Sequence, residues 1–104
     1  MTCFHNIRRD QDAVRAGLSD LPIDELYLRG DPGRMTEVVR KVSRPCLGFK
    51  ILAAGRLCNN RASMEAAFQF AFANIKKSDG VIVGMFPILT DEIAEDVAMA
   101  RKYA

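Results

Sequence analysis

The chain has 104 residues, of which 49% are hydrophobic and 27% charged, and its formal net charge is +2. These proportions are typical of a globular protein, and they exclude a disordered, collagen-like or coiled-coil chain. About 100 residues are enough for one hydrophobic core but not for two, so residues 1–104 are predicted to form a single domain.

The charges and the cysteines limit the partners of the chain. Basic and acidic residues are interspersed, and the densest basic stretch, Arg8 and Arg9, is followed at once by an aspartate. A nucleic-acid interface needs clustered cations, so none is predicted. No apolar run is long enough to cross a membrane or to act as a signal peptide. Cys3, Cys46 and Cys58 are odd in number and far apart, which disfavours a disulfide framework and favours a reducing, cytoplasmic compartment.

The first thirty residues have poorly defined secondary structure. Residues 2–7 are predicted to form a short strand, and residues 10–18 a short helix with Val14 and Leu18 on one face. Residues 21–28 mix apolar and acidic side chains and are interpreted as a connector.

Stronger signals begin at Asp31, an acidic N-cap followed by Pro32 at the first helical position. This helix is predicted to run to about residue 42, because Pro45 forces the preceding residue out of helical geometry. Residues 46–55 are mostly apolar and are interpreted as a buried strand that ends at Gly55.

A second strand and two more helices follow. Ser63 is predicted to cap a helix over residues 64–77, and residues 81–86 are interpreted as a buried strand that ends before Pro87. Thr90 is predicted to cap the last helix. The inward face of that helix is assigned to Ile93, Val97 and Ala100.

Strand and helix therefore alternate along residues 31–104. Apolar strands joined by helices are typical of a parallel sheet, whose strands need such crossovers. The sequence predicts an α/β fold with parallel strands and crossover helices.

Residues 51–56 (ILAAGR) and 79–85 (DGVIVGM) resemble strands seven and eight of many (β/α)8 TIM barrels. The run from Cys46 to Pro87 is similar to the C-terminal region of an uncharacterised bacterial TIM-barrel family. The resemblance extends over residues 31–104 and implies a partial TIM-barrel fold.

A whole barrel takes about 250 residues. This chain supplies two strands, or three if residues 2–7 are counted. Three explanations stay open: a fragment of a longer protein that lacks an N-terminal segment, a truncated reading frame, or pieces that assemble between chains. An open piece of barrel leaves unpaired edges and an uncovered apolar face, so self-association is expected.

Lys50 is the strongest catalytic candidate. Strand alternation places Leu47 and Phe49 on the helix-covered face and Gly48 and Lys50 on the barrel interior. A desolvated lysine has a lowered pKa and can form a Schiff base with a carbonyl. The position resembles that of the seventh-strand lysine in deoxyribose-phosphate aldolase-type barrels, whose Schiff-base lysine lies on strand six and has no counterpart here. A structural lysine paired with an acid is the alternative.

Two strand-ending glycines indicate a possible anion site. Gly55 and Gly84 could expose backbone N–H groups to a phosphate, and Arg56 is placed to help. Tight turns, which also need glycine, are the other explanation.

His5 is the only histidine and follows the first predicted strand, so it is a second catalytic candidate. A surface or partly buried histidine with no catalytic role is the alternative. Cys3 and His5 lack the second ligand pair of a zinc site, and no metal or cofactor is predicted. A nucleophile pair of Cys58 and His5 would need the two to lie close in space.

The sequence suggests two alternative functions. The first is the C-terminal segment of a TIM-barrel enzyme acting on a small polar or anionic metabolite, with lyase or isomerase chemistry suggested by an interior lysine. The second is a non-catalytic fragment or assembly module that pairs with another chain through its strand edges.

Overall fold

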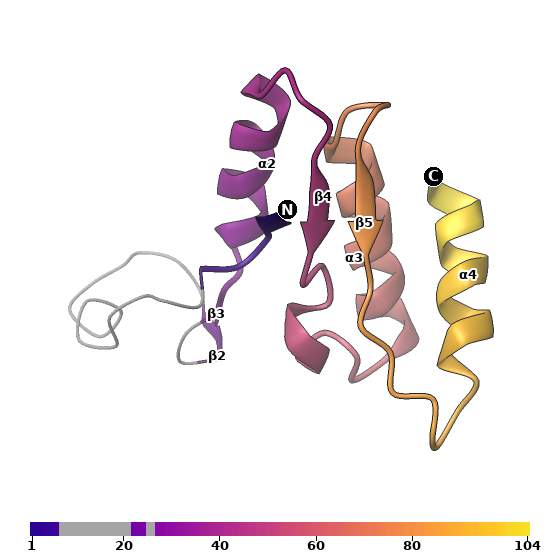
Figure 1. The fold of residues 1–104 in the computed structure, drawn as a ribbon. Coiled ribbons are helices and arrows are strands. Elements are labelled where there is room, and N and C mark those ends of the chain that lie inside the picture. Colours follow the sequence, from indigo (N-terminus) through magenta and orange to yellow (C-terminus); the bar gives the residue numbers. More distant parts are fainter. Residues whose placement is uncertain (7–21, 25–26) are drawn as a thin grey trace.

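The computed structural model describes residues 1–6, 22–24 and 27–104. Three parallel strands form a sheet in the order β1-β4-β5, with helices packed behind it, and two further strands form an antiparallel pair (Figure 1). The sheet strands are β1 (Thr2–Cys3), β4 (Leu47–Phe49) and β5 (Gly80–Ile82). The pair is β2 (Pro22–Asp24) and β3 (Tyr27–Leu28), and the helices are α2 (Asp31–Lys41), α3 (Arg61–Asn74), α4 (Glu92–Tyr103) and the short 3-10 helix η1 (Ala53–Gly55).

The parallel α/β prediction is confirmed. Gly48 is aligned with Thr2 on one side and with Val81 on the other, and both pairings are parallel. Helix α3 connects β4 to β5 behind the sheet, and the crossover is right-handed (Figure 1). The helix predicted over residues 10–18 lies outside the described residues.

Strand β4 is much shorter than the predicted strand of residues 46–55. It ends at Phe49 because the backbone turns left-handed at Lys50, with φ of 61°, and again at Ala53 and Ala54, with φ of 52° and 53°. L-residues rarely adopt these angles, and a strand cannot continue through them. Ile51 and Leu52 turn into the core instead of extending the sheet.

The core lies between the sheet and the helix layer. Phe4 from the end of β1 packs there with residues of α3 and α4; the buried members are Phe4, Ile51, Leu52, Phe68, Ala71 and Met99. A Cβ atom added at Gly48 would lie 2.5 Å from Cε1 of Phe4, so the Gly48 side of β4 faces the helices. The face assignment made from the sequence is therefore wrong. Leu47, and Ile82 on the neighbouring strand, lie on the uncovered face, where both are large exposed apolar side chains.

The inward face of α4 also differs from the prediction. Ile93 and Val97 are exposed, whereas Asp96 and Met99 are buried and Ala100 lies partly in the core. Helix α4 is turned so that a carboxylate, not an aliphatic pair, enters the packed side.

Helix starts differ from the sequence expectations by one to three residues. Gly30, not Asp31, is the N-cap of α2, and Asn60, not Ser63, caps α3 by accepting a hydrogen bond from the Ser63 backbone N–H. The N-cap of α4 is Asp91, which accepts from the N–H of Ala94. The connector predicted over residues 21–28 contains β2 and β3, which pair as an antiparallel ladder.

Candidate functional site at the carboxyl edge of the sheet

Three of the predicted site residues converge on one buried tyrosine. The amine of Lys50 donates a 3.3 Å hydrogen bond to the hydroxyl oxygen of Tyr27. The central guanidinium carbon of Arg56 lies 4.0 Å from the centre of the Tyr27 ring. The ring of His5 lies 5.2 Å from the same ring and is tilted by 45°. These four residues, called the Tyr27 cluster below, lie where β1 and β4 end.

Local backbone geometry places the two cations on the tyrosine. The left-handed turn at Lys50 ends β4, and η1 then folds the chain back over a few residues. Gly55 has φ of 89°, a conformation that suits glycine. Arg56 follows directly, and its guanidinium donates to the carbonyl oxygen of Ala53 while covering the Tyr27 ring.

Lys50 does not lie in a strand, because it is the first residue after β4. The interior position assigned to it by alternation is therefore wrong, while its side chain is partly buried at the carboxyl edge of the sheet. Its proposed catalytic role stays a prediction.

His5 is almost fully buried, with 1% of its surface exposed. Its Nδ1 atom lies 3.9 Å from Oδ2 of Asp31, a carboxylate that is itself buried. The same carboxylate accepts hydrogen bonds from the backbone N–H groups of Asn6 and Leu28, at 3.3 Å each. Asp31 therefore connects the end of β1, the end of β3 and the start of α2.

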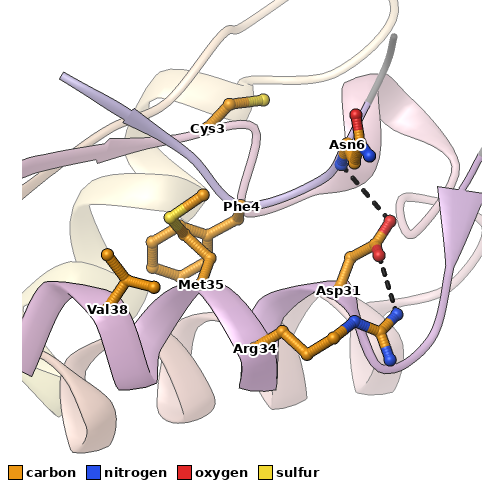
Figure 2. Close-up of a pocket in the computed structure, with 7 residues that line it drawn as sticks. All are labelled: Cys3, Phe4, Asn6, Asp31, Arg34, Met35 and Val38. Atoms are coloured by element: carbon orange, nitrogen blue, oxygen red, sulfur yellow. Dashed lines mark hydrogen bonds and ion pairs between the residues drawn. The ribbon is translucent and has the colours of Figure 1, made fainter. Parts of the chain in front are cut away.

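A cavity of about 250 Å³ adjoins this carboxylate between β1 and α2 (Figure 2). Arg34 and Asp31, one turn apart on α2, form a 2.8 Å ion pair at the cavity, and Met35 and Val38 point from α2 toward β1. Its lining consists of Cys3, Phe4, Asn6, Asp31, Arg34, Met35 and Val38.

Two cationic side chains among the described residues lie at Tyr27. The buried Asp31 carboxylate is neutralised locally by Arg34. Lys50 and Arg56 then bring two further cations to one neutral ring. A guanidinium and an ammonium that contact the same ring suit a phosphate or carboxylate group, which can accept charge-assisted hydrogen bonds from such groups.

The two glycines of the predicted anion site behave differently. Gly55 takes part in the turn that positions Arg56, as its positive φ shows. Gly84 follows β5 and is exposed, and a Cβ added there would meet no atom within 4 Å. No hydrogen bond or ring contact in the described part of the chain links Gly84 to the Tyr27 cluster.

The surroundings of the cysteines disfavour the nucleophile pair of Cys58 and His5 considered from the sequence. The Cys3 thiol donates to the backbone oxygen of His5 at 2.9 Å. The pKa of the Cys58 thiol is raised by partial burial and by the nearby carboxylates of Glu92 and Asp96. A raised pKa lowers the thiolate fraction, so Cys58 is a poor nucleophile here.

Sequence reasoning missed Tyr27 and Asp31 as site residues. Tyr27 was part of a connector with no recognisable periodicity, and Asp31 was interpreted only as a helix cap. The acidic residue before Pro32 was a visible signal, but its use as an acceptor for distant backbone groups depends on the tertiary fold.

The described part of the chain has neither a metal-binding cluster nor a membrane-spanning helix. It contains no group of three or more histidine, cysteine or acidic side chains placed to hold a metal ion. None of the helices described is both long and apolar enough to traverse a bilayer. Comparisons of the chain with protein-family models, curated proteins and solved structures find no significant match.

Proposed function

We propose that this chain forms the C-terminal part of a TIM-barrel-like enzyme that acts on a small polar or anionic metabolite. The observation that supports the proposal is the convergence of Lys50 and Arg56 on Tyr27 at the carboxyl edge of a parallel sheet. Ligands of open and closed parallel α/β folds bind at this edge.

Each member of the cluster has a role in this proposal. Arg56 offers a planar fork of N–H donors for a phosphate or carboxylate of the metabolite. Tyr27 holds the Lys50 amine at the edge through its hydroxyl oxygen. With its proton removed, that amine can attack a carbonyl carbon, form a C=N bond and release the carbonyl oxygen as water. Such a step fits lyase or isomerase chemistry.

Binding is tested with inorganic phosphate, titrated into isotope-labelled protein and followed by NMR. We expect shifts at the amides around Lys50 and Arg56, and an affinity at least fivefold lower in Arg56→Gln. The matched control is Arg101→Gln, which removes an exposed arginine from the end of α4. Equal affinities for the two variants would contradict the anion site.

Covalent chemistry is tested with glycolaldehyde and borohydride, which reduces any Schiff base to a stable amine. We expect the modification on the peptide that contains Lys50, with Lys50→Met abolishing it and Lys77→Met leaving it intact. Labelling spread evenly over all lysines would remove the Schiff-base role and leave only anion binding.

A second candidate function is an assembly module. It is favoured by the uncovered face of the sheet, where Leu47 and Ile82 are exposed, and by the outer strands β1 and β5, which pair only with β4 among the described residues. Light scattering on the purified chain tests it. A monodisperse monomer with a cooperative melt would contradict this function.

A further inference from the structure

Both outer edges of the sheet are built in the same way. Strand β4 lies in the centre, and within the described residues no strand pairs with the outer edge of β1 or of β5. All three strands run in one direction. The β5 edge of one molecule can therefore receive the β1 edge of another as a further parallel neighbour, with N–H and C=O groups matched as within the sheet.

Each outer edge has a helix with an exposed apolar pair one turn apart. On α4, which lies beyond α3 on the β5 side (Figure 1), Ile93 is 51% and Val97 39% exposed. At α2, which flanks β1, Val38 is 52% exposed and Val42, just past the helix end, 38% exposed. Inside the chain, neighbouring helices cover such residues, as α3 and α4 do at Phe68 and Met99. At the two ends no described helix covers them.

The β1 end also has space for a partner. The cavity between β1 and α2 lies beside the unpaired edge, and Met35 and Val38 line it from α2 (Figure 2). Its volume of about 250 Å³ is enough for one or two aliphatic side chains. Side chains from α4 of a neighbouring molecule, such as Val97, match this apolar lining in kind.

Charges at the first turns of the two helices agree with this juxtaposition, whereas their last turns both carry basic residues, Arg40 and Lys41 on α2 and Arg101 and Lys102 on α4. The first turn of α4 carries Glu92 and Glu95. Arg34, in the first turn of α2, is ion-paired with Asp31, and 57% of its side chain is exposed. If β5 of one molecule paired in parallel with β1 of the next, the helices that follow these strands would lie side by side with their N-termini at the same level. The acidic start of α4 would then lie near Arg34 of the next copy.

Resting on the assembly-module function, we propose that its partner is a second copy of this chain, joined head to tail. The β5 edge and α4 of one copy pack against the β1 edge and α2 of the next. Face-to-face stacking would cover Leu47 and Ile82 but leave both edges open, and a two-fold β5–β5 contact would leave β1 open. Repeating the head-to-tail contact around a ring covers both edges, both helix pairs and the bare face.

The test uses one variant for each end. Val38→Asp damages the α2 end and Val97→Asp the α4 end, and both replace exposed side chains, so the fold should survive, as circular dichroism melts will check. Ala98→Asp adds the same charge beside Val97 at an exposed position and serves as the control. Masses are measured by light scattering and native mass spectrometry, with one variant isotope-labelled.

Wild type and Ala98→Asp are expected at a small multiple of 11.6 kDa. Either end variant alone should be monomeric, because each joint needs one intact end of each kind. An equimolar mixture of the two should form one-to-one pairs and nothing larger. End variants that still associate alone would overturn the head-to-tail joint but not the assembly module, whereas a monomeric wild type would overturn both. Phosphate binding at Arg56 tests the enzyme proposal separately.

Discussion

The guanidinium group of Arg56 covers the ring of Tyr27, with its central carbon 4.0 Å from the ring centre. Contacts of this kind contribute about 0.5–2 kcal/mol, more when they are shielded from water. Since Lys50 bonds to the hydroxyl group of the same ring, Tyr27 closes the segment from residue 50 to residue 56 at both ends.

Replacing Tyr27 by phenylalanine separates its two contacts. The ring under Arg56 stays, and the hydrogen bond from Lys50 is lost, so we expect a loss of about 0.5–1.5 kcal/mol in the free energy of unfolding. Tyr27→Leu removes both contacts and should cost more. Urea denaturation measures the series. The phosphate titration described above has a matched control in Tyr103→Phe. This change removes a hydroxyl group bonded to Glu65, and it should leave the phosphate affinity unchanged.

Gly48 lies so close to Phe4 that a residue with a side chain does not fit in its place. A Cβ atom 2.5 Å from Cε1 of that ring cannot be accommodated without moving a fully buried side chain. Gly48→Ala should therefore destabilise the chain by about 1–3 kcal/mol, as overpacked cores do. Gly33→Ala is the matched change, because its Cβ meets nothing within 4 Å inside α2, and it should stabilise the chain by about 0.5–1 kcal/mol. Equal effects in thermal melts would contradict the packing described at Gly48.

Asp96 should destabilise the folded chain at neutral pH, and this destabilising contribution should disappear in acid. Its pKa is raised by burial and by the charges of Glu92 and Glu95. The folded state therefore binds a proton more tightly than the unfolded state, and stability rises as the pH falls through the folded-state pKa. Below the ordinary pKa of 3.8 this effect is complete.

Asp96→Asn is thus expected to be more stable than the wild type at pH 7, with the difference shrinking toward pH 3. Urea midpoints at the two pH values measure it. Asp91→Asn retains the oxygen that caps α4 and serves as the control for removing one negative charge from the same end of the helix. A destabilised Asp96→Asn at pH 7 would show that the carboxylate has a partner in solution.

Asp79 should have the opposite pH dependence. Burial raises the pKa of this carboxyl, but hydrogen bonds from the Cys46 N–H and from the Lys76 ammonium and N–H outweigh it, and the net pKa lies below the ordinary 3.8. Its contribution to stability is therefore present above that value and is lost as the pH falls through the folded-state pKa.

Asp79→Asn should lower the urea midpoint at pH 7, because the amide cannot replace the ion pair with Lys76. The gap between variant and wild type should narrow in strong acid, where the wild-type carboxyl is protonated. If the difference in urea midpoint between Asp79→Asn and the wild type stayed constant across the acid range, the loss of stability would come from altered packing and not from the lost charge.

The order of strands and helices could be predicted because it depends on local signals. The apolar runs of residues 46–55 and 81–86 overlap the parallel strands β4 (Leu47–Phe49) and β5 (Gly80–Ile82), although both strands end earlier than predicted and α2 ends at Lys41, before Pro45. The strand faces could not be predicted. Neither the lysine at position 50 nor its sequence neighbours predict a left-handed turn there. That turn ends the alternation of side chains on which the face assignment depended.

The site was predictable only in part. His5, Lys50 and Arg56 could be chosen as polar groups that follow strands, and the structure brings them together. Their meeting point, Tyr27, lies in a short antiparallel strand pair that no periodicity reveals. The buried face of α4 was missed for a related reason, since Asp96 occupies a position that hydrophobic patterning assigns to an apolar residue.

The left-handed backbone at Lys50, Ala53 and Ala54 has an evolutionary consequence. Each such residue costs about 1–2 kcal/mol relative to glycine, so a variant library selected for folding alone should fill these three positions with glycine and asparagine. A library selected for ligand capture should do so at 53 and 54 but keep lysine at 50. The two enrichment profiles would differ at a single codon, and that codon would report whether strain is tolerated there for the sake of the charge.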